Sequence, residues 1–485
     1  MSKSRGEVLP GAFGSWELPG TCAQCGADGR TGRTSPRLPR NPELGCPHEG
    51  LRHRGGELGD RGGAGAAGAR DRLRLLREGV ADRGNWRYEN DNGMSSAYRS
   101  LHINTSRRVM AFKSLPMPEG YPDYPDHFQM AAYFDEVVDR YRLQERIKFK
   151  TEVLSVEPVA GSGGEWDVTV AGPDGRSTER YGAVLVANGH HWDPRWPEPA
   201  FAGADEFTGE QIHAHEYREP DALRGKRVLV LGIGNSAVDI AVESSRIGEK
   251  TFLATRRGAW VIPKYLNGKP IDEIANSVTG LAPIPVMRAV MNRSLKVAVG
   301  DPTDYGLPKP DHKLLEAHPT VSSEFLPRLG HGDITAKPNI DRFTGGRTVR
   351  FVDGSEEEVD LVVYCTGYKI SFPFLRPEVL SAPDNVLPLY RRVVPVDRPG
   401  LYVIGLVQPL GPIMPLAEAQ CEWVADLISG RAVLPPVAEM EREIEAEEEK
   451  QRKRFVASKR HTVEVDFYPY LREIRRERKR AAAPA

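Results

Sequence analysis

A glycine-spaced turn near the middle of the chain could hold a phosphate group. Residues 232–237 read Gly-Ile-Gly-Asn-Ser-Ala, which is the spacing G-x-G-x-x-A. The first glycine permits a sharp turn, the second lets backbone approach a pyrophosphate, and the small third residue lets helix and strand pack closely. A phosphate then meets a helix N-terminus, where free backbone N–H groups favour an anion. We predict dinucleotide binding by Gly232, Gly234, Asn235, Ser236 and Ala237.

The residues beyond the next apolar run indicate which dinucleotide is bound. An NAD site would have an acidic residue there for the ribose hydroxyl, but this chain has Thr255, Arg256 and Arg257. A guanidinium pairs with a 2′-phosphate, which a carboxylate would repel. One such contact contributes about 1.5 to 3 kcal/mol, or roughly a 10- to 150-fold preference for NADPH over NADH. We prefer Arg256 as the phosphate contact, with Arg257 second; a solvated pair of surface arginines is the alternative.

The segments around the turn have the pattern of a strand–helix–strand unit. Residues 228–231 are an unbroken apolar run, which is typical of a strand buried on both faces of a parallel sheet. Residues 238–242 supply the buried side of a helix, and residues 251–254 form the next apolar strand. This context makes the glycine spacing a specific signal. A turn that only joins a strand to a helix is the alternative.

Length, charge and cysteine content limit the class of protein. A chain of 485 residues predicts two or three domains. With 66 basic and 67 acidic residues the net charge is -1, which gives no electrostatic argument for nucleic acid or an anionic membrane. The chain has no apolar signal segment, and no apolar run approaches the roughly 18 residues of a membrane span. Five cysteines fit a reducing cytoplasm, where we expect the protein.

Residues 1–83 differ in composition from the rest. They contain 17 glycines, 13 arginines and no isoleucine, so they offer little that could form a buried strand. Gly63, Gly65 and Gly68 have the spacing G-x-G-x-x-G, but no apolar strand precedes them, and Gly84 comes before any second strand that ends in an acidic residue. We interpret this segment as atypical and disordered. Its cysteines lack the surrounding pattern of a zinc site, and we predict no metal.

From residue 84 onward, aromatic residues, histidine and asparagine interleave with prolines, as expected of loops that line a cofactor pocket. An amphipathic helix is predicted at residues 130–141. Alternating strands of an antiparallel meander are predicted at 147–149, 152–156 and 166–170, and an apolar strand at 183–187. From residue 438 the chain predicts a charged helix, with Glu to Lys or Arg spacings of three and four.

Five groups of residues resemble the flavin-containing monooxygenase family. The most specific is F-x-G-x-x-x-H-x-x-x-Y at Phe207, Gly209, His213 and Tyr217, directly before the glycine turn. The others follow in family order: GNWRY at 84–88, LHINTS at 101–106, VVYCTGY at 362–368, and GLVQPLG with PLAEAQ at 405–420. The resemblance extends from residue 84 to about residue 470.

This resemblance implies an α/β fold of two Rossmann-like dinucleotide-binding domains, with the NADPH domain inserted into the FAD domain. It implies an FAD domain at 84–200 and 340–436, an NADPH domain at 205–335 and a charged helical tail at 437–485. The strand at residues 361–364 is expected to belong again to the flavin domain. Residues 282–323 contain several prolines and are expected to be irregular structure on the nicotinamide side.

The resemblance also implies the chemistry. NADPH reduces FAD, oxygen adds to the reduced flavin, and the C4a-peroxyflavin gives an oxygen atom to a soft nitrogen or sulfur nucleophile. Asn104 matches the family asparagine beside the flavin and is the catalytic candidate, since an amide can donate and accept hydrogen bonds; an asparagine that caps a local turn is the alternative. His213 and Tyr217 are expected to hold the interdomain linker. Flavin binding is implied for Gly63, Gly65, Gly68, Gly84, Asn85, Trp86, Arg87, His102, Asn104, Thr366, Gly367, Gln408 and Leu410.

The start of the chain departs from the family pattern. A first strand–helix–strand unit for FAD should precede Gly84 by roughly thirty residues, so residues 1–83 are interpreted as a degraded or mistranslated version of it. Three functions stay open: an N- or S-oxygenating monooxygenase, which Tyr217 favours, a Baeyer–Villiger monooxygenase, and a catalytically silent NADPH-binding remnant. The expected partners are a small nucleophilic substrate and O2, without nucleic acid or membrane, and a homodimer is left open.

Overall fold

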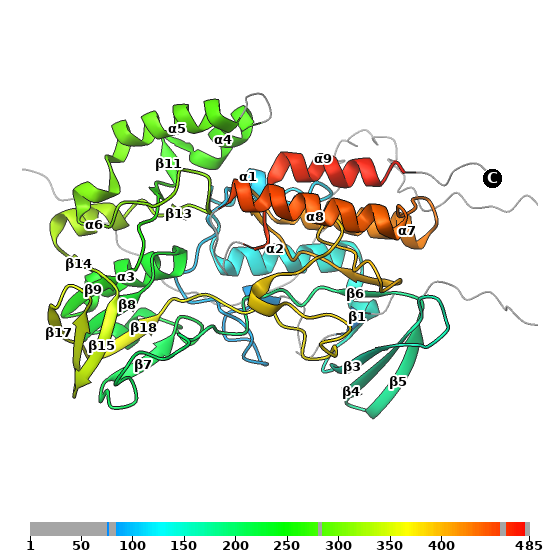
Figure 1. Ribbon diagram of the computed structural model, residues 1–485, viewed down its shortest axis with the longest axis horizontal. Coiled ribbons are helices and arrows are strands. Elements are labelled where there is room, and N and C mark those ends of the chain that lie inside the picture. Colours follow the sequence, from blue (N-terminus) through cyan, green and yellow to red (C-terminus); the bar gives the residue numbers. More distant parts are fainter. Residues whose placement is uncertain (1–74, 77–83, 280–283, 456–461, 481–485) are drawn as a thin grey trace, which may run out of the picture. The chain divides into compact units, whose positions relative to one another are not determined.

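The protein is described by a computed structural model of residues 75–76, 84–279, 284–455 and 462–480 (Figure 1). The chain separates into two compact units, residues 1–70 and 71–485. Every described residue lies in the second unit. Gly63, Gly65 and Gly68 therefore fall outside the described residues, as does most of the Gly/Arg-rich segment.

A five-stranded parallel sheet in the order β14-β9-β8-β18-β7 carries the glycine turn. Its strands are β7 (Glu210–His213), β8 (Arg227–Leu231), β9 (Lys250–Ala254), β14 (Ile334–Lys337) and β18 (Leu361–Tyr364). The middle strand β8 is buried on both faces, as its unbroken apolar run predicts.

Alternate residues of β8 contribute to two different cores. Val228 and Val230 pack with α3 (Asn235–Ile247), which covers one face of the sheet. Leu229 and Leu231 pack on the other face with an antiparallel sheet of β15 (Ile340–Gly345), β16 (Thr348–Phe351) and β17 (Glu356–Glu358). The strand–helix–strand unit predicted from the sequence is thus the centre of a three-layer arrangement.

The strand at Leu361–Tyr364 corrects one expectation. It was expected to return to the flavin domain, but β18 pairs in parallel with β8, Leu361 opposite Val228, and with β7 on its other side. It therefore belongs to the sheet that carries the glycine turn. An apolar strand carries no mark of which sheet it will join, because any open parallel edge satisfies its backbone hydrogen bonds equally well.

The flavin-side strands form smaller sheets. Strand β3 (Glu152–Pro158), β4 (Trp166–Gly172) and β5 (Gly175–Tyr181) make the expected antiparallel meander, in which β5 was not predicted. The strand expected at residues 147–149 is instead β2 (Ile147–Lys148), and it pairs in parallel with β1 (Leu75–Leu76). The expectation of no strand before Gly84 is therefore wrong. An acidic residue, Glu78, follows β1 in the sequence.

The parallel strands on the flavin side do not form one sheet. Besides the β1–β2 pair, β6 (Val184–Val186) pairs only with β19 (Leu401–Val403), and within the described ranges no strand joins the two pairs. The effect on burial is large. Leu185, in the middle of β6, is 41% exposed, whereas Leu229, in the middle of β8, is 0% exposed.

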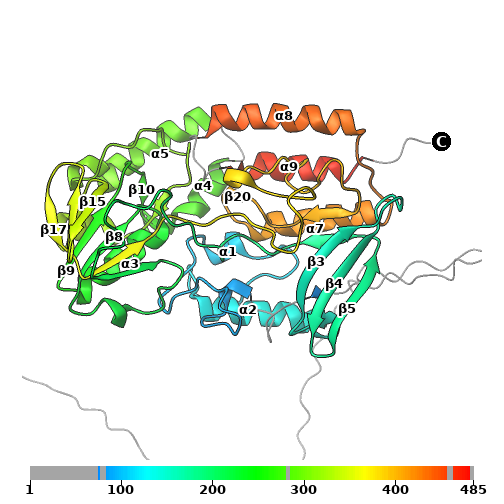
Figure 2. The ribbon, with the colours of Figure 1, turned by 60° about the horizontal axis from the view of Figure 1, so that its bottom comes forward.

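Three long helices belong to the carboxyl-terminal part. Figures 1 and 2 show α7 (Met414–Ile428), α8 (Val437–Arg454) and α9 (Phe467–Glu477) running side by side, and Trp423, Met440 and Ile474 bring all three into one core. The charged tail helix predicted from residue 438 is α8. The helical tail expected at 437–485 is divided, because a second helix, α9, follows β21 (Glu464–Asp466).

The region expected to be irregular contains a helix. Residues Ile284–Val299 form α5, because Leu295, Met287 and Met291 lie on one face and pack against Ile262.

The remaining elements are short or lie between the sheets described above. The helices are α1 (Arg107–Met110), α2 (His127–Arg140), α4 (Ile271–Thr279) and α6 (Phe325–His331). The strands are β10 (Val261–Ile262), β11 (Tyr265–Leu266), β12 (Lys269–Pro270), β13 (Thr320–Val321), β20 (Gln408–Leu410) and β21 (Glu464–Asp466). Over the described part of the chain, no helix combines the length and the apolar character that crossing a bilayer requires.

The different burial of two mid-strand leucines gives a testable prediction. Leu229→Ala should destabilise the protein by about 2 to 5 kcal/mol, because it leaves a cavity in the core between the parallel sheet and the β15–β17 sheet. Leu185→Ala should cost less than about 1 kcal/mol, because its side chain is partly in solvent. Urea unfolding of the two variants and the parent measures both. An equal loss in the two variants would mean that a further chain segment covers β6.

Candidate cofactor site

The glycine turn has the backbone geometry that close approach of a phosphate requires. Gly232 has a φ of +135°, and a Cβ there would lie 2.7 Å from the carbonyl oxygen of Cys365, so only glycine fits. Gly234 is the N-cap of α3, which starts at Asn235. Ala237 is fully buried, which lets α3 pack closely against the sheet. The first backbone N–H groups of α3 are thus available to an anion.

A short segment from much later in the chain braces this turn. The Asn235 side-chain oxygen accepts a hydrogen bond from the backbone N–H of Val321 at 2.8 Å. The Thr320 hydroxyl donates to the carbonyl oxygen of Ile233 at 2.5 Å. The Asn235 amide oxygen therefore holds the turn in shape. Sequence reasoning missed Thr320 and Val321, because residues 282–323 were expected to be irregular.

The two arginines after β9 differ in their partners. Arg257 pairs with Asp311, with 3.5 Å between Nε and Oδ2. Thr255 is buried and its hydroxyl donates to the carbonyl oxygen of Arg257 at 2.7 Å. Arg256 is exposed and makes no ion pair with any residue in the described ranges. Its guanidinium is the one that remains available for an anionic ligand.

The Trp86 and Asn104 segments meet in one core. Trp86 packs against a cluster that contains Ile103 and Met414, so the 84–87 segment, the 101–106 loop and the start of α7 lie together. Nη1 of Arg87 is buried and finds no hydrogen-bond partner in the described part of the chain. A buried unpaired guanidinium nitrogen is costly, so this atom is suited to donate to a ligand oxygen.

Asn104 lies in a loop whose preceding residues are held by hydrogen bonds. Ile103 donates its backbone N–H to the carbonyl oxygen of Pro125 at 3.0 Å, and the imidazole of His102 contacts the Ser100 carbonyl oxygen at 2.8 Å. The Asn104 side chain makes no hydrogen bond with a described residue, so it does not cap a local turn. Its amide can therefore meet a ligand.

Four further predicted flavin contacts, Thr366, Gly367, Gln408 and Leu410, bind or pack against other parts of the protein. The Thr366 hydroxyl donates to the carbonyl oxygen of Arg195, and Arg195 donates its backbone N–H to Gly367 at 2.9 Å. Gln408 donates its backbone N–H to Val463 at 2.8 Å. Leu410 packs against the cluster around Ile262 rather than against the Trp86 core.

The four residues of the Phe-Gly-His-Tyr pattern make structural contacts. A Cβ at Gly209 would lie 2.5 Å from the ring of Phe207, so glycine is required there. The His213 Nδ1 atom accepts a hydrogen bond from the backbone N–H of His215 at 3.0 Å. The Tyr217 hydroxyl donates to Glu243 on α3. These contacts fasten the segment before β8 to the helix that follows it.

A partly buried polar cluster that sequence reasoning missed joins residues Tyr98 and Ser100 to α3. The Tyr98 hydroxyl donates to Asp239 at 2.5 Å, and the Ser100 hydroxyl donates to Glu243. Burial raises the pKa of Asp239 to about 6. The available signal was the spacing of Asp239 and Glu243, which puts two carboxylates on one face of a helix that otherwise packs in the core.

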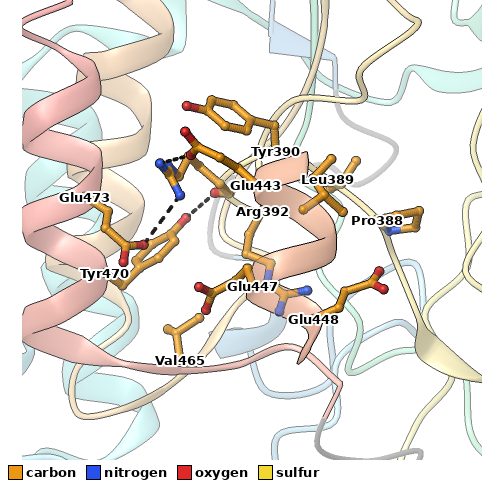
Figure 3. A pocket seen from close by; sticks show the side chains of 12 residues that line it. Pro388, Leu389, Tyr390, Arg392, Glu443, Glu447, Glu448, Val465, Tyr470 and Glu473 are labelled. Atoms are coloured by element: carbon orange, nitrogen blue, oxygen red, sulfur yellow. Dashed lines mark hydrogen bonds and ion pairs between the residues drawn. The ribbon is translucent and has the colours of Figure 1, made fainter. Parts of the chain in front are cut away.

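One cavity lies elsewhere, between α8 and the segment at Leu389. Figure 3 shows Tyr390, Arg392, Glu443 and Glu473 around it, and its volume is about 20 Å³. Such a space holds about one water molecule. None of the predicted cofactor residues lines it, so it is no dinucleotide site.

Comparison with known proteins identifies the family. The family described as flavin-binding monooxygenase-like matches residues 78–480. The chain belongs to this family. It is 38% identical over 403 residues to flavin-containing monooxygenase 5 of Rattus norvegicus, covering 81% of this chain and 75% of the relative. It is 34% identical over 404 residues to dimethylaniline monooxygenase [N-oxide-forming] 2 of the same species, with the same coverage.

Solved structures agree on the fold. S-allyl-L-cysteine S-oxygenase from Allium sativum matches with a TM-score of 0.62 at 25% identity, over 85% of this chain and 84% of that chain. A steroid monooxygenase bound to NADP matches with a TM-score of 0.61 at 18% identity, over 84% of this chain and 92% of that chain. The chain therefore has the expected α/β fold. Its family and its named relatives make it a flavin monooxygenase that depends on FAD and NADPH.

The described residues fit the two cofactors unequally. For NADPH, the close turn at Gly232, the N-terminus of α3 and the unpaired Arg256 are all present. For FAD, the unpaired Nη1 of Arg87 and the unpartnered Asn104 amide fit a ligand with several acceptors. A glycine turn for the FAD pyrophosphate would precede β1, outside the described residues. The family match starts at residue 78, beyond Gly63, Gly65 and Gly68.

The buried histidine of the Phe-Gly-His-Tyr pattern predicts a pH dependence of stability. Burial disfavours the imidazolium and lowers the pKa of His213 to about 4. Because the unfolded chain takes up the proton first as pH falls, His213 should reduce the free energy of unfolding by about 2 kcal/mol between pH 7 and pH 5. In His213→Asn, whose amide oxygen can still accept from His215, the loss between these pH values should be smaller. Thermal unfolding at both pH values measures it, and identical losses in parent and variant would refute the assignment.

Proposed function

We propose that this chain uses NADPH, FAD and O2 to oxygenate a soft nitrogen or sulfur nucleophile. The observation that carries the proposal is the position of the Asn104 loop. Its backbone is hydrogen-bonded to Pro125 on the flavin side and to Lys264 and Asp272 on the NADPH side, while the Asn104 amide has no partner among the described residues. An unoccupied amide between two dinucleotide-binding regions is suited to contact both cofactors.

A bound flavin would supply the oxygen chemistry, because no protein side chain activates O2 readily. The residues of the chain orient and protect. Arg87 is available to hold FAD through its buried guanidinium, and Asn104 to hydrogen-bond at the reactive face of the flavin. A dry site matters here because water breaks down the reactive intermediate.

The choice of substrate atom rests on relatives. One relative is named as an N-oxide-forming dimethylaniline monooxygenase and one solved structure as an S-oxygenase. Both names describe oxygen transfer to a soft heteroatom. Cyclohexanone monooxygenase has the same fold with a TM-score of 0.59, but at 18% identity this likeness bears on the fold alone.

The first experiment measures bound flavin and then products. The purified full-length chain should show a flavin absorption spectrum after addition of FAD, and should oxidise NADPH with formation of an N-oxide or sulfoxide from a tertiary amine or a thioether. Esters or lactones from ketones, without heteroatom products, would favour a Baeyer–Villiger enzyme. Binding of NADPH without any flavin would favour the catalytically silent alternative, which the separated β1–β2 and β6–β19 pairs would explain.

The catalytic assignment is tested in the active protein. Asn104→Ala should shift NADPH consumption from oxygenated product to hydrogen peroxide, because the amide no longer steadies the flavin and the bound nicotinamide. Peroxide formed per NADPH consumed is the measurement. Asn339→Ala, a substitution outside the loop, is the matched control. A peroxide share equal to that of the parent would remove Asn104 from the mechanism.

The nicotinamide preference is tested separately. Arg256→Ala should lower the ratio of kcat/KM for NADPH over NADH by roughly 10- to 150-fold, because a charge-assisted contact to the 2′-phosphate is lost. Arg257→Ala is the control, since this arginine is paired with Asp311. If the ratio falls only in Arg257→Ala, the roles of the two arginines are reversed.

A further inference from the structure

Ile103 and Ser106, which lie on either side of Asn104 in the sequence, both bind residues of the predicted NADPH domain. Asp272, in the first turn of α4, accepts hydrogen bonds from the backbone N–H and the hydroxyl of Ser106, each at 2.7 Å. On the other side, the Lys264 ammonium donates to the carbonyl oxygen of Ile103 at 3.4 Å. These contacts join positions that are 166 and 161 residues apart in the sequence.

Ser106 uses a hydroxyl that would ordinarily serve its own helix. It is the N-cap of α1, a position where a serine side chain usually accepts a hydrogen bond from the first turn. Here that bond is absent, and the hydroxyl points to Asp272 instead. Ser106 is fully buried, so its contact with the carboxylate is shielded from water.

Tyr124 connects Lys264, which binds Ile103, with Asp272, which binds Ser106. Its hydroxyl donates to the backbone carbonyl oxygen of Lys264 at 2.5 Å and lies 3.4 Å from the second carboxylate oxygen of Asp272. The backbone N–H of Ile271 also donates to that Lys264 oxygen, at 2.9 Å. Tyr124 is buried, and its residue neighbour Pro125 holds Ile103. The Asn104 loop is therefore enclosed by one continuous hydrogen-bonded group.

We propose that Asp272 is a positioning residue that holds the Asn104 amide in register with the nicotinamide. Asp272 touches neither cofactor turn; it acts through Ser106, two residues from Asn104. Asp272 lies in α4, within the predicted NADPH domain. The position of Asn104 in the predicted flavin domain is therefore set by a residue of the other domain. The inference rests on the proposed function and predicts an effect on oxygen transfer, with little effect on NADPH affinity.

The neighbouring residue provides a matched control. Glu273 lies on the same helical turn and pairs with Arg108 of α1 at 3.6 Å, but it contacts neither Ile103 nor Ser106. Asp272→Ala and Glu273→Ala thus remove one carboxylate each from the same helix, and only the first releases the Asn104 loop. Asp272→Asn retains an acceptor oxygen for Ser106 without the charge.

The first measurement is hydrogen–deuterium exchange of the full-length protein, which requires no turnover. Exchange at the Ser106 amide should accelerate by roughly 10- to 100-fold in Asp272→Ala, since a charge-assisted hydrogen bond is lost. It should change little in Glu273→Ala, with Asp272→Asn between the two. Unchanged exchange in Asp272→Ala would overturn the proposal, whether or not the chain is an oxygenase.

The second measurement is the peroxide formed per NADPH consumed. In Asp272→Ala this share should rise several-fold, while the KM for NADPH stays within about 2-fold, and Asp272→Asn should restore part of the coupling. A purely structural role would lower the unfolding temperature with an unchanged peroxide share, and that result would also overturn the proposal. A parent chain that binds both cofactors and forms no oxygenated product would instead contradict the proposed function, and the proposal with it.

Discussion

The close backbone contact between Gly232 and Cys365 is the constraint on which the cofactor region depends. It occurs where the neighbouring strands β8 and β18 end at the same edge of the sheet. The chain leaves β8 through the glycine turn and leaves β18 through Thr366 and Gly367, which are hydrogen-bonded to Arg195. A side chain at residue 232 would separate these two exits. One glycine therefore determines both the shape of the turn after β8 and the path of the chain after β18.

The helix after the turn, α3, serves two purposes. Its N-terminus faces the predicted phosphate, and its polar face carries Asp239 and Glu243, which receive hydrogen bonds from Tyr98, Ser100 and Tyr217. A carboxylate that is partly removed from water is stabilised by hydrogen bonds. Here the hydroxyl donors come from the segments before the Asn104 loop and before β8, so these bonds also fasten both segments to α3. The Asp272 contacts continue this connection on the far side of Asn104.

The two halves of the protein differ in how completely their sheets are built. The NADPH-side sheet has five strands, and its middle strands are buried on both faces. On the flavin side, the parallel pairs β1–β2 and β6–β19 remain separate, and an apolar residue of β6 faces solvent. The residues that fit the flavin itself, Arg87 and Asn104, belong to loops supported by the α2 and α7 core rather than by these strands. The flavin-side site therefore depends on side-chain packing more than on a continuous sheet.

The sequence by itself determined the features that arise from neighbours along the chain. The turn at residues 232–237, the strands on either side of it, two of the three meander strands, the tail helix and the family membership all follow from periodicity, glycine spacing and short patterns. Prolines between residues 282 and 323 suggested irregular structure, yet α5 forms because packing of Leu295 outweighs weak local signals. Domain limits, and the cofactor roles assigned to single residues, remain predictions.

Only the tertiary structure decided which segments meet. It placed β18 beside β8, paired β1 with β2, engaged Arg257 while giving Arg256 no ion pair with a described residue, and set Asp272 against Ser106. None of these pairings is visible in the sequence, because a strand edge, a carboxylate or a serine hydroxyl accepts many partners of the same chemistry. The partner is chosen by the global packing of segments more than a hundred residues apart, where burial makes an unsatisfied group costly and so selects one arrangement.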